Sequence, residues 1–263
     1  MQLAISDWVR ELQPQLVAWR RDFHMYPEAG WTEFRTASLV AQELSQLGYN
    51  IKLGREVISE QSRQGVPSAE ELDKAWERAR KEGAPTEFIM SMRGGFTGVV
   101  GILEGGYPGP TVALRFDMDA NDLNESTNED HRPFREGFAS RHPGIAHACG
   151  HDGHVAIGLG VAHVLAQLAP ELSGRLLLIF QPAEEGVRGA KAMVAADILA
   201  DCRYFLSGHL GFGNGSLGEI GCGQEKFLAT TKLDVTFTGQ AAHAGMNPDA
   251  GKNALLAAAL AAI

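Results

Sequence analysis

The sequence is poor in cysteine, in basic residues and in long apolar runs. Its 263 residues include three cysteines, an odd number in a chain without secretory features, so a disulfide framework is not expected. Lysine and arginine number 23 against 32 aspartates and glutamates, a formal net charge of -9, which argues against a nucleic-acid-binding face. No apolar run approaches the roughly 20 residues that span a bilayer. The amphipathic segment 1–23 lacks the unbroken apolar stretch of a signal peptide, so we expect a cytoplasmic protein.

Hydrophobic residues make up 44% of the chain, enough for one large core, and their pattern predicts an α/β fold. Helical periodicity over 31–47 ends at Gly48, as it would at a C-terminal cap. From Phe96 onward, short apolar strands alternate with helices, which is typical of a three-layer αβα domain around a mostly parallel mixed sheet. Strands are expected at 99–103, 111–116, 175–180 and 204–207, and helices at 155–168 and 190–199.

Two stretches depart from this pattern and suggest how the domains are organised. Residues 55–93 are polar and contain a serine-capped, charged helix, so we interpret them as an insertion. Strict alternation of polar and apolar residues at 230–237 predicts a half-exposed antiparallel strand. We therefore expect a catalytic domain over 1–225 and the start of a smaller α+β domain over 226–263. Because the alanine-rich helix that begins at Asn253 has no stop signal, we expect the sequence to be part of a longer protein.

Side chains that can bind metal follow each core strand at its carboxyl end, the edge where parallel α/β sheets bind ligands. Asp117 and Asp119 follow one strand, Glu184 and Glu185 follow the next, and His209 follows a third. We therefore expect these side chains to converge on one edge of the sheet.

The loop 147–154, with the sequence HACGHDGH, supplies further candidate ligands. A hydrolytic metal site needs a few nitrogen, oxygen or sulfur ligands, an open position for water and a nearby general base. Cys149 and His151 can both face a metal from an extended loop, and Gly150 and Gly153 allow that geometry. Adjacent glutamates send their side chains in different directions, so one can bind metal while the other holds the attacking water.

Each of these features also has a simpler interpretation. Cys149 alone is more often a buried, inert thiol, and a glutamate pair alone is usually a solvated turn. The two aspartates could form an ordinary strand-end turn, and His209 could be a core histidine. The occurrence of all these features together favours a metal site. His147, His154 and His24 are expected to support it by orienting ligands or substrate.

Four motifs resemble those of one metalloenzyme family. They are HACGHDGH at 147–154, QPAEEG at 181–186, RDFH at 21–24 and AAHAG at 241–245. Together they are similar to the aminoacylase and N-acyl-amino-acid amidohydrolase branch of the dinuclear metallocarboxypeptidases, and the resemblance covers nearly the whole chain.

The resemblance implies roles for individual residues and a site for two divalent ions, manganese or zinc. The implied metal ligands are Cys149, His151, Glu185 and His209. Glu184 would be the general base, Asp119 the acid that orients the site, and His243 an oxyanion contact that reaches the site of a neighbouring protomer. Related carboxypeptidases place a metal-binding histidine at Asp117, so the role of Asp117 is open. The smaller domain would be a lid that also forms dimers.

We therefore expect hydrolysis of an amide that joins an acyl or aroyl group to an amino acid, with p-aminobenzoyl-glutamate as the first candidate substrate. Two alternatives stay open. One is a broader N-acyl-amino-acid or peptide amidohydrolase, and the other is a non-catalytic subunit that binds metal or a related second subunit. The family supplies a fifth metal-binding histidine near its C-terminus, beyond Ile263. This chain alone is therefore expected to bind metal weakly and to be inactive.

Overall fold

The computed structural model describes residues 2–211, 216–222, 231, 233 and 235–262. The chain divides into two compact units, Met1–Gly215 and Ser216–Ile263, and each is described by itself. The helices of the first unit are α1 (Gln2–Met25), α2 (Phe34–Gln46), α3 (Ala69–Lys81), α4 (Thr86–Ile89), α5 (Arg132–Arg135), α6 (His151–Leu168) and α7 (Gly189–Val194). Its strands are β1 (Asn50–Leu53), β2 (Val99–Glu104), β3 (Tyr107–Asp117), β4 (Ser173–Gln181) and β5 (Cys202–Ser207).

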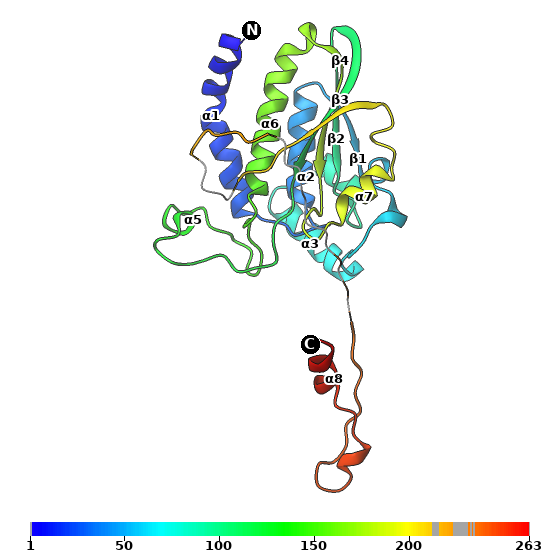
Figure 1. The fold of residues 1–263 in the computed structure, drawn as a ribbon. Coiled ribbons are helices and arrows are strands. Elements are labelled where there is room, and N and C mark those ends of the chain that lie inside the picture. The colour runs from blue at the N-terminus through cyan, green and yellow to red at the C-terminus, as the bar shows by residue number, and fades with distance from the viewer. Residues whose placement is uncertain (1, 212–215, 223–230, 232, 234, 263) are drawn as a thin grey trace. The chain divides into compact units, whose positions relative to one another are not determined.

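The strands form one mixed sheet in the order β1-β2-β4-β3-β5. β3 pairs in parallel with β4 and β5, whereas β2 pairs antiparallel with β1 and β4. β2 therefore runs opposite to the other four strands, and the expected α/β fold with a mostly parallel mixed sheet is confirmed. Figure 1 shows α1, α2 and α6 on one side of the sheet and α7 on the other, which gives three layers.

The predicted elements are present with small shifts at their ends. Each of the four apolar runs lies within one of the strands β2 to β5. Gly48 has a φ of 85° and follows the end of α2, as expected of a C-terminal cap. The helix expected at 190–199 is shorter, because α7 ends at Val194 and Asp197 adopts a left-handed φ of 61°, which interrupts a helix. The edge strand β1 was not predicted.

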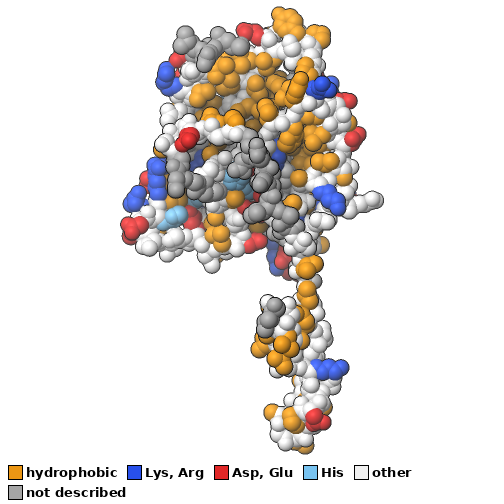
Figure 2. Space-filling model, viewed as in Figure 1, with side chains coloured by type: hydrophobic (Ala, Val, Ile, Leu, Met, Phe, Trp, Pro, Cys, Tyr) orange, Lys and Arg blue, Asp and Glu red, His pale blue; other side chains and the backbone are white. Residues whose placement is uncertain are grey.

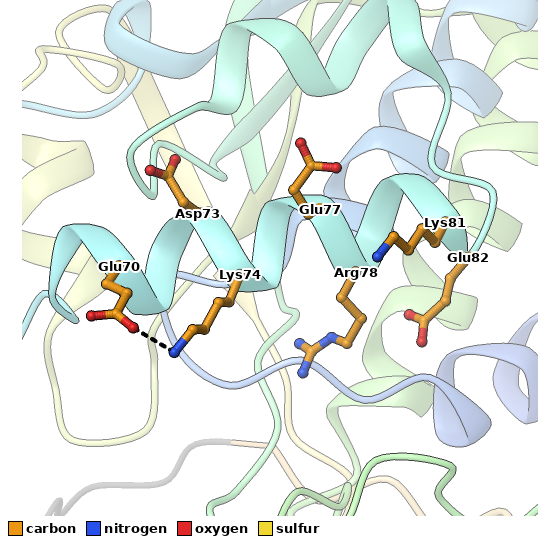
Figure 3. Close-up of a pocket in the computed structure, with 7 residues that line it drawn as sticks. All are labelled: Glu70, Asp73, Lys74, Glu77, Arg78, Lys81 and Glu82. Atoms are coloured by element: carbon orange, nitrogen blue, oxygen red, sulfur yellow. Dashed lines mark hydrogen bonds and ion pairs between the residues drawn. The ribbon is translucent and has the colours of Figure 1, made fainter.

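The insertion, 55–93, contributes to the core as well as to the surface. α3 begins after Ser68, whose hydroxyl accepts a hydrogen bond from the Glu71 N–H while the Glu71 carboxylate accepts one from the Ser68 N–H, so the predicted serine cap is confirmed. Leu72 and Trp76 on its inner face are buried, so the insertion does more than decorate the surface. Figure 3 shows its outer face, where charged side chains line a shallow hollow of about 710 Å³: Glu70, Asp73, Lys74, Glu77, Arg78, Lys81 and Glu82.

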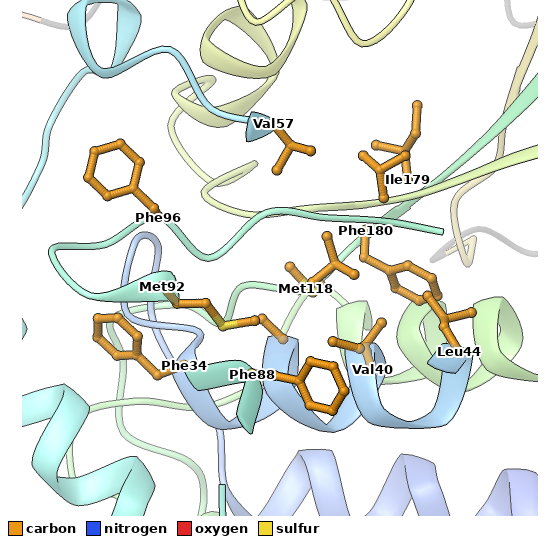
Figure 4. Packing of buried hydrophobic residues seen from close by; sticks show 14 of the residues in the cluster. Phe34, Val40, Leu44, Val57, Phe88, Met92, Phe96, Met118, Ile179 and Phe180 are labelled. Atoms are coloured by element: carbon orange, nitrogen blue, oxygen red, sulfur yellow. The ribbon is translucent and has the colours of Figure 1, made fainter. Parts of the chain in front are cut away.

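The hydrophobic core lies between the sheet and the helices that cover it. Figure 4 shows Val40 and Leu44 of α2 beside Phe180 of β4. Gly158 of α6 lies over the rings of Phe116 and Phe180, and a Cβ at this position would come within 2.7 Å of the Phe180 ring. Glycine therefore allows α6 to approach the sheet closely.

One helix and one edge strand of the first unit are unusually apolar. With the turn that follows it to Glu171, α6 is long and apolar enough to cross a membrane by length and composition, but it packs between α1 and the sheet as a core helix does. β5 is an edge strand, and its side chains Tyr204, Phe205 and Leu206 are exposed. Figure 2 shows hydrophobic side chains gathered on the face of the unit that carries β5 in Figure 1. An exposed apolar edge strand offers a surface on which further chain can pack.

The second unit contains the 3-10 turn η5 (Pro248–Ala250) and helix α8 (Ala254–Ala261). The helix expected from Asn253 is confirmed, and the Asn253 side chain caps it by accepting a hydrogen bond from the Leu256 N–H at 2.9 Å. The strand expected at 230–237 lies partly outside the described residues, and its described residues are not in a strand. A strand needs a neighbour to share its backbone hydrogen bonds, and the described part of this unit contains one isolated bridge, between Gln240 and Lys252.

Candidate metal centre

The candidate site lies at the carboxyl edge of the three parallel strands. Asp117 ends β3 beside Gln181, the last residue of β4, and His209 follows β5 by two residues. His151 is the first residue of α6, directly after Gly150, whose φ of 84° turns the loop into the helix. The parallel pairing of these strands thus brings residues from distant parts of the sequence to one edge.

Three groups of side chains in the described residues could hold a metal ion, and His151 belongs to all of them. They are Cys149, His151 and His209; Asp117, His151 and His154; and His151, Glu184 and Glu185, with potential ligand atoms within 4.8 Å of one another in each group. The Cys149 Sγ lies 3.4 Å from the His209 Nε2, and the His151 Nε2 lies 3.9 Å from a Glu184 carboxylate oxygen. The predicted ligands Cys149, His151, Glu185 and His209 are therefore brought together around His151.

In two of the candidate ligands, His151 and His209, a hydrogen bond fixes which ring nitrogen carries the proton. The His151 Nδ1 lies 2.8 Å from the Asp119 carbonyl oxygen and the His209 Nδ1 lies 2.8 Å from the Leu210 carbonyl oxygen, so each Nδ1 carries the proton that it donates. In the neutral form of each ring this leaves a lone pair on Nε2, the arrangement typical of metal-binding histidines.

Buried atoms without partners also fit a metal ion at this position. Among the described residues, the His151 Nε2 and one carboxylate oxygen of Glu185 are buried and have no hydrogen-bond partner. Such atoms cost free energy unless something binds them. Two imidazoles, a thiolate and a carboxylate form a donor set that suits zinc and is compatible with manganese.

Without a bound cation, the pKa values of Cys149 and His151 are both raised. Burial raises the pKa of the Cys149 thiol to about 12, with the charge of Glu185 acting in the same direction. Burial lowers the pKa of His151, but the hydrogen bond and charge of Asp119 outweigh that effect and raise it to about 9. A metal ion at this site would therefore have to displace protons in order to bind.

Two buried carboxylates hold the turn that carries the glutamate pair. The oxygens of Asp119, which is fully buried, accept hydrogen bonds from the N–H groups of Glu184 and Glu185, each at 2.9 Å. Glu33, just before α2 and also fully buried, accepts one from the Ala183 N–H at 2.8 Å and one from the Thr97 hydroxyl at 2.6 Å. Ala183 has a φ of 49°, a strained conformation for alanine, and these contacts add to the backbone hydrogen bonds within the turn, such as that from the Val187 N–H to the Glu184 carbonyl oxygen at 2.7 Å.

Glu33 was not among the predicted site residues. The signal available in the sequence was an acid within an apolar segment, two residues after Trp31 and directly before Phe34. In the structure both of these aromatic residues are buried. Acids in such positions are seldom fully buried unless a partner binds them.

Glu184 is half-buried and lies beside His151 and Glu185. Burial raises the pKa of its carboxyl group, and the charge of Asp117 acts in the same direction. The Glu184 Oε1 lies 4.0 Å from the Arg115 guanidinium, and the other carboxylate oxygen faces His151. A carboxylate that keeps some affinity for a proton and lies next to the candidate ligands can take and return the proton of a water molecule.

Asp117 and His154 lie beside His151, with which they form the second of the three groups. Arg115 contacts Asp117 directly, and the His154 Nδ1 lies 3.7 Å from the other Asp117 oxygen. The Leu210 N–H donates a hydrogen bond to the His154 Nε2 at 3.0 Å, so the His154 proton resides on Nδ1 and faces Asp117. This arrangement leaves His154 without a lone pair for a metal in its neutral form.

His24 and His147 lie deeper, between α1 and the start of α6. His24 is hydrogen-bonded to Asp152 and to Glu125, both at 2.7 Å, and Asp152 also pairs with Arg20 at 2.9 Å. This network connects α1 to the residue that follows His151. Burial lowers the pKa of His147 to about 4, so its ring is neutral at pH 7.

His243 belongs to the second unit. There its Nδ1 accepts a hydrogen bond from the Gly245 N–H at 3.1 Å.

Comparison with known proteins gives consistent matches. The pattern of peptidase family M20/M25/M40 matches residues 113–263. Indole-3-acetyl-aspartic acid hydrolase of Enterobacter agglomerans is 57% identical over 98% of this chain, and one subunit of the p-aminobenzoyl-glutamate hydrolase of Escherichia coli (strain K12) is 55% identical over 99% of it. The chain spans 59% of the length of each of these relatives.

Two solved structures add to these matches. The aminobenzoyl-glutamate utilization protein from Klebsiella pneumoniae has a TM-score of 0.77 and 49% identity, with 97% of this chain and 57% of that chain covered. Bacillus subtilis YXEP, described as a dinuclear metal binding peptidase from the M20 family, has a TM-score of 0.56 and 28% identity, with 76% of this chain and 44% of that chain covered.

Proposed function

Because the chain belongs to peptidase family M20/M25/M40, we propose that its complete protein is a metal-dependent hydrolase of the amide bond between an acyl or aroyl group and an amino acid. One observation carries the proposal. Asp119 fixes the backbone of Glu184 and Glu185 beside the donors Cys149 and His151, so a candidate base and candidate ligands share one rigid support.

Two divalent ions, manganese or zinc, would be held by this chain together with residues of the complete protein. The proposed ligands in this chain are Cys149, His151, Glu185 and His209. When bound, such ions polarise an amide carbonyl and lower the pKa of bound water. The resemblance to a dinuclear metal binding peptidase supports a two-metal site.

The side chains of the chain itself would handle the proton. Glu184 takes a proton from the attacking water and returns it to the amine nitrogen that leaves. The return step is required because an unprotonated amide nitrogen is a poor leaving group. Asp119 keeps Glu184 in place throughout, and His243 would donate a hydrogen bond to the oxyanion from the lid domain of a neighbouring protomer.

The names of the relatives support one class of substrate. Indole-3-acetyl-aspartic acid and p-aminobenzoyl-glutamate both join an aromatic acyl group to an acidic amino acid. We therefore propose N-aroyl or N-arylacetyl derivatives of acidic amino acids as substrates, with p-aminobenzoyl-glutamate first. The likeness to an N-acyl-L-amino acid amidohydrolase of Geobacillus stearothermophilus, 32% identical, keeps a broader substrate range as the alternative.

The proposal extends to assembly and location. The relative from Escherichia coli is named as one subunit of its enzyme, which supports a related second subunit here. A dimer formed through the lid domain is the arrangement we propose. A purely non-catalytic subunit is the second candidate function, favoured by that name alone. We also propose a cytoplasmic location.

Replacement of Glu184 by Gln in the complete protein, assembled with any partner subunit, tests the proposal. The variant should bind metal as the wild type does and should lose hydrolysis of p-aminobenzoyl-glutamate by about 10²- to 10⁴-fold, the usual contribution of a general base. Glu77→Gln on the outer face of α3 is the matched control and should leave both unchanged. Glu184→Gln activity within a few-fold of wild type would remove Glu184 as the base. A wild-type protein that cleaves neither p-aminobenzoyl-glutamate nor indole-3-acetyl-aspartate when metal-loaded would favour the non-catalytic subunit.

A further inference from the structure

Arg188 connects the turn of the candidate site to the insertion. Its Nε donates a hydrogen bond to the Glu185 carbonyl oxygen at 2.9 Å, and its Nη1 donates one to the Gly65 carbonyl oxygen at 3.1 Å. Gly65 and Arg188 are 123 residues apart in the sequence. Among the described residues, both of these partners of the Arg188 guanidinium are backbone carbonyls.

The turn needs partners of this kind because its backbone is unusual. Ala183, Gly186 and Val187 have φ values of 49°, 87° and 58°, a region that residues other than glycine rarely adopt. Glu33 and Asp119 hold three of its N–H groups, those of Ala183, Glu184 and Glu185. Backbone N–H groups of Val187 and Gly189 bind the carbonyls of Glu184 and Ala183, and the Arg188 guanidinium binds that of Glu185.

On the insertion side, the loop that contains Gln64 and Gly65 is held by Trp31 and packs against Arg188. The Trp31 Nε1 donates a hydrogen bond to the Gln64 carbonyl oxygen at 2.8 Å, and Trp31 is fully buried. Gly65, the next residue, has a φ of 58°, and a Cβ built on it would come within 2.7 Å of the Arg188 Cδ. The loop is thus anchored in the core at one residue and fitted closely against Arg188 at the next.

We propose that Arg188 is a positioning residue through which the insertion sets the orientation of Glu185 and Glu184. The inference rests on the proposed function for its consequence in catalysis, although its geometric part concerns the placement of a metal ligand alone. The insertion would then be a working part of the site, because a shift of the loop around Gly65 would be transmitted through one guanidinium to the backbone of a ligand.

Variants on both sides of the connection test this inference in the complete protein. Arg188→Met keeps an unbranched apolar stem that reaches as far as the arginine Nε but removes both hydrogen bonds, and Arg188→Lys can restore one. Gly65→Ala places a Cβ against the Arg188 Cδ but leaves residue 188 an arginine. Gly83→Ala is the matched control, since Gly83 also lies in the insertion and has a φ of 90°, but a Cβ there would meet no atom within 4 Å.

Two readouts separate positioning from general stability. The first is the split between kcat and KM for p-aminobenzoyl-glutamate, and the second is the visible absorption spectrum of the cobalt-substituted protein, which reports on ligand geometry without turnover. Arg188→Met should lower kcat about 10- to 100-fold with KM within about twofold, as a displaced catalytic group does. Its cobalt spectrum should change, Arg188→Lys should recover part of both effects, and Gly65→Ala should change both in the same direction.

The inference is overturned if Arg188→Met and Gly65→Ala keep the wild-type kcat and cobalt spectrum. It is also overturned if Gly83→Ala matches Gly65→Ala, because backbone strain alone would then explain the loss. If Arg188→Met does not fold, the two glycine variants decide the question. A wild-type protein without hydrolase activity contradicts the proposed function, while a cobalt spectrum altered by Arg188→Met would still support the placement of Glu185 by Arg188.

Discussion

Replacing Glu33 by Gln should make the stability of the protein less sensitive to high pH. Glu33 is fully buried, and its two oxygens accept hydrogen bonds from Thr97 and Ala183. Burial, and then the charge of Asp119, raise the pKa of Glu33 from 4.5 to about 8. In the unfolded chain the same group would release its proton at about 4.5.

The sign of the effect follows from proton binding. Between pH 4.5 and about 8 the folded state holds a proton on Glu33 that the unfolded state has lost, so the free energy of unfolding falls as pH rises through this window and levels off above it. One pKa unit corresponds to about 1.4 kcal/mol, so the window of roughly 3.5 units contributes a loss on the order of 5 kcal/mol. Glutamine cannot ionise. Its carbonyl can accept the Ala183 N–H, and its amide can donate to the Thr97 hydroxyl.

We therefore expect Glu33→Gln to lie within about 1 kcal/mol of wild type at pH 5, the size of a single altered hydrogen bond. At pH 9 it should be more stable than wild type by a few kcal/mol. Urea unfolding of the metal-free protein at pH 5, 7 and 9, followed by tryptophan fluorescence, measures this difference. Glu87→Gln, at an exposed position of α4, is the control and should show no pH-dependent difference. A difference between Glu33→Gln and wild type that stays constant from pH 5 to 9 would refute the reasoning.

Two further predictions concern the metal ligands and the core. Cys149→Ala should lower the metal content found by elemental analysis and reduce the number of protons released on metal binding, because the thiol holds its proton up to a pKa of about 12 without a cation; an unchanged stoichiometry would remove Cys149 from the ligand set. Gly158→Ala should destabilise the protein by about 1–3 kcal/mol through overpacking, since its Cβ would come within 2.8 Å of both Phe116 and Phe180. Gly160→Ala would meet only the flexible ends of Leu16 and Leu12, so equal melting temperatures for the two variants would contradict this packing argument.

The strands that the sequence predicts are short runs of mostly apolar residues, whether they are buried like β4 or exposed like β5. β4 and the second half of β3 appear as continuous apolar runs because helices cover the sheet, and such runs need no tertiary information to be recognised. β1 has four residues, alternates between exposed and half-buried positions, and owes its strand conformation to its pairing with β2. Nothing local distinguishes such a segment from a turn.

The short connection between β2 and β3 indicates that β2 runs in the reverse direction, although the hydrophobic periodicity of the strands does not. Only Gly105 and Gly106 separate β2 from β3, and a parallel crossover needs about a dozen residues or more. The two strands must therefore run in opposite directions, and β4 lies between them. Glycine suits this crossing, because a Cβ on Gly106 would come within 2.2 Å of the Pro170 carbonyl oxygen.

The site was predictable where its residues follow strand ends and unpredictable where its support is tertiary. Asp117, Glu184 and His209 could be assigned to one edge because parallel strands end there together. Glu33 precedes a helix and Arg188 follows the turn, and neither position implies a contact with the candidate ligands. Their roles depend on how α2 and the insertion pack, which the spacing of residues along the chain does not encode.

Asp119 explains how two adjacent glutamates can serve different purposes. In a strand or helix, neighbouring N–H groups diverge or run in parallel, whereas here the N–H groups of Glu184 and Glu185 converge on the two oxygens of one carboxylate. Asp119 also fixes the proton of His151 on Nδ1 through its carbonyl oxygen, at 2.8 Å. One buried residue therefore positions the candidate base, one candidate ligand and the lone pair of another. Asp119 acts in this arrangement by orienting other groups, and its own carboxylate oxygens are engaged by the turn.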